Sequence, residues 1–167
     1  MLSAIAYQDF RYRKISAWLL ILLPACIVMG YLYSPVSGIH VSFKNILINS
    51  GFIGLLLSGV SIYFIIRNGH LTKIIDTYIG WGDVLFLFIA TGIFSPVNFI
   101  LFCIAGFLSA IILFGLVQLL SPNPKREIPL AGILSVVLLL GLSNQYITGS
   151  FNLQEDSFFL DKLSLLW

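Results

Sequence analysis

Charged residues are spaced so widely along this chain that long apolar stretches separate them. Four stretches of 22 to 41 residues contain no Asp, Glu, Lys or Arg. They lie between Lys14 and Lys44, between Lys44 and Arg67, between Asp83 and Lys125, and between Glu127 and Glu155. A helix needs about 20 apolar residues to cross the hydrocarbon core of a bilayer. Helices fit these stretches better than barrel strands, because polar and apolar residues do not alternate in them.

The apolar stretches divide into five predicted membrane-spanning helices. The 41-residue stretch is divided at Ser95-Pro96, because proline disfavours helix in the residue before it and has no N–H to donate. Pro122 and Pro124 mark the next turn in the same way. The predicted spans are residues 15–34, 46–66, 74–94, 97–120 and 128–148. We therefore expect an all-α polytopic bundle, with residues 1–150 as a single domain.

The two ends of the chain differ from these spans. Residues 1–8 could form only about 12 Å of helix, so we expect a short N-terminal segment. Residues 151–167 are too charged to span a membrane, and as a helix they would have one apolar face and one polar face. The apolar face would carry Phe159, Leu160, Leu163, Leu166 and Trp167, and the polar face Glu155, Lys162 and Ser164. This pattern predicts an amphipathic helix lying in the membrane interface.

Composition supports a membrane protein and excludes other classes. Apolar residues make up 59% of the chain and charged residues only 10%, whereas soluble domains carry about 25% charged residues. This excludes a water-soluble globule, a disordered tail and a nucleic-acid binder. Seven basic residues fall on one side of the predicted topology and two on the other, which places the larger group in the cytoplasm and the C-terminus outside. The larger group is Arg11, Arg13, Lys14, Arg67, Lys73, Lys125 and Arg126, and the smaller is Lys44 and Lys162.

Small residues repeat at every fourth position within two predicted spans, which favours close helix packing. In the second span the repeat is Ser50, Gly54 and Ser58, and in the fourth it is Ala105 with Ser109 and Gly106 with Ala110.

Cys26 and Cys103 stand alone in apolar spans, so we expect small buried side chains, with no disulfide framework, metal site or cofactor.

Asp83 lies nine residues into a predicted span, where an ionisable group is costly and therefore a functional candidate. The alternative is a helix that begins at Asp83 itself, with the carboxyl capping it in water. Asp9 is followed by three basic residues and, taken alone, reads as an exposed acid paired with them. Together, two carboxyls near one membrane face supply what an aspartic protease needs. They share one proton, one activating water and the other polarising the scissile carbonyl.

Three motifs give a family resemblance. Asp9-Phe-Arg-Tyr-Arg-Lys-Ile15 resembles the first catalytic motif of type IV prepilin peptidases, and Gly80-Trp81-Gly82-Asp83 matches their Gly-x-Gly-Asp motif. Lys125-Arg-Glu-Ile-Pro-Leu130 is similar to the Ile-Pro-Phe stretch that opens a late span in the family. The motifs occur in the family's order between Asp9 and about residue 134.

The resemblance implies an intramembrane aspartyl endopeptidase in the bacterial cytoplasmic membrane. Asp9 and Asp83 would be the catalytic pair, and Ile128 and Pro129 would contribute to substrate binding. The substrate would be a prepilin or pseudopilin, cut at its short basic leader on the cytoplasmic face. Gly80 and Gly82 have no Cβ, so they would let either a substrate or a neighbouring helix approach Asp83.

Several features differ from the family. Ser16-Ala17 replaces the usual Pro-Asn, and Leu85 stands where a Lys is frequent. The chain has no insert with paired Cys-x-x-Cys motifs, which favours a peptidase without methyltransferase activity. A rival function from another class is a membrane scaffold or small transporter subunit, in which Asp83 serves helix association or ion passage.

Overall fold

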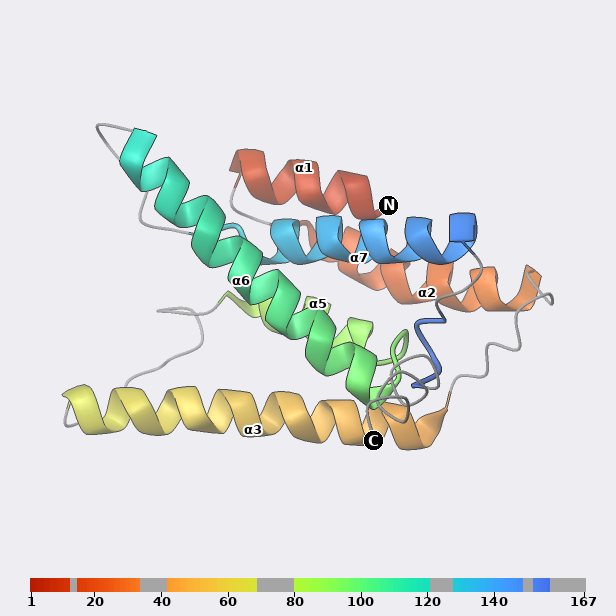
Figure 1. The fold of residues 1–167 in the computed structure, drawn as a ribbon, viewed down its shortest axis with the longest axis horizontal. Coiled ribbons are helices and arrows are strands. Elements are labelled where there is room, and N and C mark those ends of the chain that lie inside the picture. The colour runs from red at the N-terminus through yellow and green to blue at the C-terminus, as the bar shows by residue number, and fades with distance from the viewer. Residues whose placement is uncertain (13–14, 34–41, 69–79, 121–127, 149–151, 157–167) are drawn as a thin grey trace, which may run out of the picture.

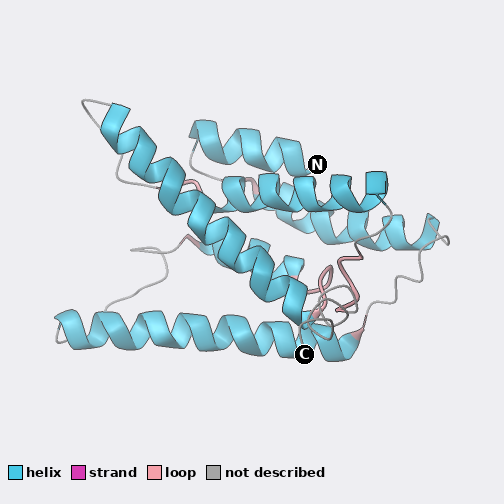
Figure 2. Ribbon diagram, in the orientation of Figure 1, coloured by secondary structure: helices cyan, strands magenta, loops and turns pink. Residues whose placement is uncertain are grey.

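The computed structural model describes residues 1–12, 15–33, 42–68, 80–120, 128–148 and 152–156. Within these residues the chain is all-helical, as the sequence predicts, and contains no strand (Figure 2). The six described helices are α1 (Leu2–Tyr12), α2 (Ala17–Tyr33), α3 (Phe43–Asn68), α5 (Trp81–Ala90), α6 (Pro96–Leu120) and α7 (Leu130–Thr148).

Three of these helices, α3, α6 and α7, are long and apolar enough to cross a membrane. Most of their apolar side chains are exposed, as expected of a surface that faces lipid. The three helices indicate a membrane protein, but the prediction of five spans is not confirmed. With 17 residues α2 is about 26 Å long, and with ten residues α5 is about 15 Å long.

The largest difference from the sequence prediction lies in the third expected span, residues 74–94. Its described part is helical only from Trp81 to Ala90, and residues 74–79 lie outside the described chain. Gly80 has extended backbone and precedes the helix, while Thr91 to Phe94 form a turn before Pro96 begins α6. The extended glycine and the turn that begins at Thr91 therefore bound a helix too short to span.

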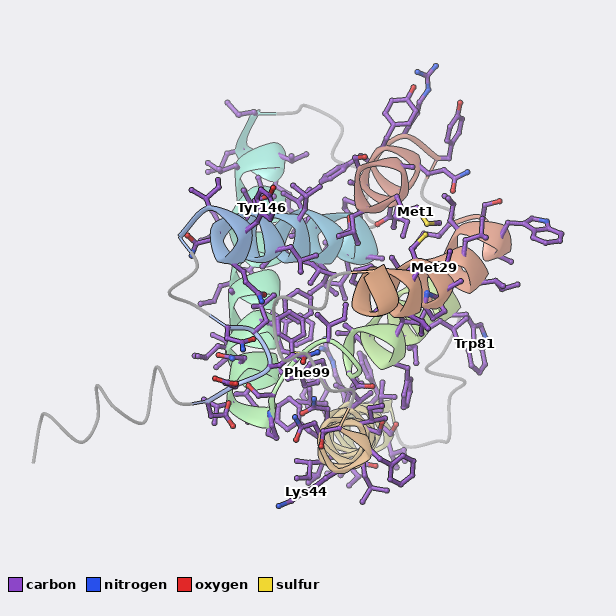
Figure 3. The ribbon with its side chains drawn as sticks, turned by 90° about the vertical axis from the view of Figure 1, so that its right-hand side faces the viewer. Met1, Met29, Lys44, Trp81, Phe99 and Tyr146 are labelled. Carbon is purple, nitrogen blue, oxygen red and sulfur yellow. The ribbon has the colours of Figure 1, made fainter. Side chains whose placement is uncertain are left out.

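Helices α1 and α7 lie side by side, α6 crosses α7 at an angle, and α3 runs along the opposite side of the molecule (Figure 1). Helix α5 contacts α2, α3 and α7. Phe99 is fully buried and lies between the helices, whereas Lys44 and Tyr146 lie at the periphery (Figure 3). The Phe94 and Phe102 rings stack with centroids 4.7 Å apart beside Phe99. This aromatic cluster packs the turn after α5 against α6.

The small-residue repeats have different outcomes on α6 and α3. Gly106 is buried against Leu134 of α7 and Ala110 is buried too, so this pair supports close packing as predicted. Ala105 is exposed, and Ser109 donates a hydrogen bond back to its carbonyl. On α3 the packing prediction is wrong for Gly54, because a Cβ placed there would have no neighbour within 4 Å.

Two buried asparagines, Asn49 and Asn98, hold non-helical backbone; we call them the asparagine clamp. Asn49 donates to the carbonyl oxygens of Thr91 and Phe94, at 3.1 and 2.9 Å. The Asn98 side-chain nitrogen lies 3.0 to 3.1 Å from three carbonyl oxygens in the turn formed by residues 152–156. The clamp therefore satisfies backbone groups that no helix pairs.

The described start of the C-terminal tail is not the predicted amphipathic helix. Residues 152–156 form a turn, and Leu153 is buried in the core. The backbone N–H of Ser95 donates to the Leu153 carbonyl, and the Ser95 hydroxyl donates to Asp156. The remainder of the tail, residues 157–167, lies outside the described chain. Most of the basic residues that define the predicted topology also lie outside it, so that topology stays a prediction.

Candidate active site

Asp9 lies on the buried face of α1. Ile5, Ala6 and Asp9 occupy one side of this helix and are its buried residues. Asp9 is only 6% exposed, so the alternative of an exposed surface acid is wrong. Among the neighbouring bases, Arg11 is exposed and donates to the Tyr7 hydroxyl at 2.6 Å. The one carboxyl of helix α1, that of Asp9, therefore points into the molecule, whereas Arg11 of the same helix points outward.

Asp83 lies in the first turn of α5, three residues after Gly80. Its backbone N–H donates to the Gly80 carbonyl at 3.1 Å, and its side chain is half-buried. The described helix begins at Trp81, so Asp83 is near the start of a helix and not in the middle of one. This is close to the capping alternative, but the carboxyl makes its bond to a different helix.

The two carboxyls meet at the start of α7. Asp83 Oδ1 accepts a hydrogen bond from the backbone N–H of Ala131 at 2.8 Å, and Asp9 Oδ2 accepts one from Gly132 at 2.6 Å. Ala131 and Gly132 are consecutive residues, and consecutive Cα atoms are only about 3.8 Å apart. The fold thus brings together two acids that are 74 positions apart in the sequence, as an aspartyl pair requires.

Burial and the neighbouring charge both affect Asp83, which lies outside the three spanning-length helices. Burial raises the pKa of Asp83 from its ordinary value of 3.8 to about 6, the hydrogen bond from Ala131 opposes this rise, and the negative charge of Asp9 adds to it. Since two adjacent carboxyls resist ionising together, the pair favours a state with one shared proton up to about pH 6.

The two glycines of the Gly-x-Gly-Asp motif have different surroundings. A Cβ at Gly82 would come within 3.2 Å of Ile15, so Gly82 permits close packing against the α1–α2 connection. A Cβ at Gly80 would come within 3.3 Å of Asp83 Oδ2, and Gly80 is exposed. The glycine at position 80 therefore leaves space beside the carboxyl.

Ile128 and Pro129 directly precede the turn of α7 that holds the two acids. Ile128 is exposed and Pro129 is half-buried. The Pro129 carbonyl accepts the N–H of Ile133, the first bond of this kind in α7. All three motifs noted in the sequence therefore meet at one point of the fold.

Sequence reasoning missed three residues at this point: Gln8, Ala131 and Gly132. Gln8 accepts the backbone N–H of Ser16 through Oε1 at 2.9 Å, which ties the end of α1 to the start of α2. Ala131 and Gly132 act through backbone groups, which no side-chain motif reveals. A glycine three residues after Pro129, at the start of an apolar stretch, was the available signal.

The described residues contain no group of three or more His, Cys, Asp or Glu side chains arranged to hold a metal ion. Cys103 is buried on α6, as expected of a small core residue. Cys26 is exposed on α2, where its sulfur lies 3.1 Å from that of Met1, so the expectation of burial was wrong. Helix α2 has apolar residues on all sides, so a position in this apolar stretch does not imply burial within the protein.

Comparison with known proteins gives no further guide. No protein-family model, curated protein or solved structure matches this chain. Function is therefore inferred from the carboxyl pair and the motifs around it.

Proposed function

We propose that this protein is an intramembrane aspartyl endopeptidase in which Asp9 and Asp83 form the catalytic pair. The observation that carries the proposal is the meeting of both carboxyls on consecutive N–H groups of α7. Asp9, Asp83 and the Ile128-Pro129 step belong to the three motifs that resemble type IV prepilin peptidases. Carboxyl side chains from two separate helices converge on the backbone of a third, which favours a built site over an isolated buried acid.

The chemistry follows from one proton shared by two carboxyls. The ionised carboxyl takes a proton from a water molecule while the water oxygen bonds to the scissile carbonyl carbon. The protonated carboxyl gives its proton to the carbonyl oxygen, which yields a neutral tetrahedral diol. When the diol collapses, the C–N bond breaks and the amine nitrogen takes a proton from the protonated carboxyl. At the same time one diol hydroxyl gives its proton to the ionised carboxyl as the carbonyl forms again. One carboxyl is then protonated and the other ionised, as at the start.

The surroundings of the pair suit this reaction. Asp9 is buried, whereas Asp83 is half-buried beside exposed Gly80, so water and a peptide can approach from the Asp83 side. The raised pKa of Asp83 suits it to hold the shared proton before reaction. By resemblance, the peptide is the basic leader of a prepilin or pseudopilin, presented just before its hydrophobic helix.

The proposal is tested with the full chain purified and placed in liposomes. The substrate is a peptide with a short basic leader joined to an apolar helix of about 20 residues, and cleavage is followed by mass spectrometry. Asp9→Asn and Asp83→Asn should each lower the cleavage rate at least ~10³-fold, because either change removes one of the two proton-transfer groups.

Glu155→Gln is the matched control, since it neutralises an exposed carboxyl in the turn held by Asn98. It should cleave at the wild-type rate. Cleavage by either Asn variant at the wild-type rate would contradict the proposed mechanism. A wild-type protein that cuts no such peptide would instead favour a membrane scaffold or transporter subunit.

A further inference from the structure

The first turn of α7 is capped in an unusual way. The leading N–H groups of a helix have no partner within the helix and are generally satisfied by a polar side chain just before it. Here the residue before α7 is Pro129, whose side chain has no acceptor. The N–H groups of Ala131 and Gly132 instead donate to acids from α5 and α1.

Gly132 makes room for one of these acids. A Cβ at this position would lie 3.0 Å from Asp9 Oδ2, 3.1 Å from Asp9 Cβ and 3.4 Å from a ring carbon of Phe10. The nearest of these contacts are tighter than nine in ten that real Cβ atoms make, and they involve the stem of Asp9 as well as its carboxyl. With any other residue here, α1 would have to shift away from α7 by a few tenths of an ångström.

The N–H of Gly132 also acts on the charge of Asp9. A bond of 2.6 Å to a carboxyl oxygen, made at the positive end of a helix, favours the ionised carboxyl. Within the described chain, Asp83 is the other acid at this corner, and α2 and α7 bring no charged side chain. Tyr7, Arg11 and Tyr12 of α1 are exposed, with the Arg11 guanidinium over both rings.

We propose that Gly132 is a positioning residue for the peptidase, holding the Asp9 carboxylate through its backbone N–H while its missing side chain admits α1. This inference rests on the proposed function. Under this proposal the two carboxyls have different protonation states. The N–H of Gly132 stabilises the negative charge on Asp9, and the shared proton stays with Asp83.

The test compares Gly132→Ala with Gly141→Ala on the same helix, where a Cβ would make an ordinary 3.7 Å contact with Leu153. Gly132→Ala should lower kcat roughly 3- to 10-fold, because its Cβ displaces Asp9 by a few tenths of an ångström, a fraction of the ~1 Å misplacement that costs about 100-fold. KM should stay within about twofold of the wild type, and the acid limb of the kcat/KM profile should move to higher pH. Gly141→Ala should match the wild type. An unchanged kcat and pH profile in Gly132→Ala would overturn the inference.

A second measurement separates this inference from the proposed function, because it needs no substrate. In an Asp83→Asn background, the titration of the Asp9 carboxyl is followed by carbon-13 NMR with and without Gly132→Ala. The pKa of Asp9 should be about one pH unit higher in the alanine variant. Replacing the Gly132 peptide N–H by an ester oxygen should give the same shift without adding a Cβ, even if the alanine variant fails to fold. If neither change moves the Asp9 titration, Gly132 does not hold this carboxylate.

Discussion

The carboxyl pair and the asparagine clamp both bring polar side chains to backbone groups, but with opposite electrostatics. In the clamp, the neutral amides of Asn49 and Asn98 donate to carbonyl oxygens of turns. At the start of α7, two acids of the same charge accept from consecutive N–H groups. The clamp adds hydrogen bonds without charge repulsion, whereas the pair gathers two groups that repel each other when both are ionised.

This difference matches a structural use of buried polar groups in the clamp and the proposed catalytic use in the carboxyl pair. Turns that lie against an apolar core need donors for their carbonyl groups, and Asn98 supplies them at a position that is only 2% exposed. A Ser or Asn before the helix would cap one of the leading N–H groups of α7 without repulsion between charges. Two acids at the same helix end repel each other when both are ionised, and we attribute this cost to the catalytic role proposed above.

The largest stability effect is expected in the clamp. Asn98→Ala removes a donor that serves three carbonyl oxygens and should lower the free energy of unfolding by about 3 kcal/mol. Unfolding of the purified protein in mixed micelles, titrated with a denaturing detergent, measures this loss. Asn45→Ala, at a half-buried position near the start of α3, should cost much less. Equal losses in the two variants would show that the clamp has no special structural role.

The carboxyl pair should behave in the opposite way. The pKa of Asp83 is about 6 in the fold against 3.8 ordinarily, so the folded state binds the proton more tightly than the unfolded chain. Wild-type stability should therefore fall as pH rises from about 4 to 6, by roughly 2 to 3 kcal/mol from this group. Asp83→Asn has no such loss.

Asp83→Asn should consequently be more stable than the wild type above pH 6, and the two should converge near pH 4. Thermal unfolding followed by circular dichroism at several pH values measures the difference. An Asp83→Asn protein that is less stable than the wild type at pH 7.5 would mean that the carboxylate is a net stabilising cap and not a costly functional group.

A smaller effect is expected where α6 packs against α7, between the carboxyl pair and the asparagine clamp. A Cβ at Gly106 would overlap the Leu134 side chain, two residues after Gly132. Gly106→Ala should cost about 1 to 2 kcal/mol through overpacking and should also reduce cleavage, because the strain displaces the first turn of α7. A Cβ at Gly115 on the same helix would have no neighbour within 4 Å. Gly115→Ala should therefore leave the stability and the cleavage rate unchanged. If the Gly106 variant loses stability but keeps full activity, the position of α7 against α6 does not govern the pair.

Part of the fold could be predicted because the signal is local. Long apolar stretches and the Ser95-Pro96 step predicted helices and the start of α6, and Gly106 marked a close helix contact. The prediction of the third span was wrong in its described part, because the apolar pattern continues through Thr91 to Phe94 while the backbone turns. That turn is held by Asn49, which lies 42 residues away from Thr91 in the sequence. A hydropathy pattern does not predict such a long-range contact.

The sequence by itself determined that the chain is helical and suited to a membrane, and it singled out Asp9 and Asp83, because a carboxyl near apolar stretches is conspicuous from its immediate neighbours. Tertiary structure alone decided that Asp9 is buried, that Gly132 receives it and that both acids share one helix end. The bond from Gly132 to Asp9 joins residues 123 positions apart. It forms only once α1 has packed against α7, which depends on the shapes of whole helices and not on any local pattern.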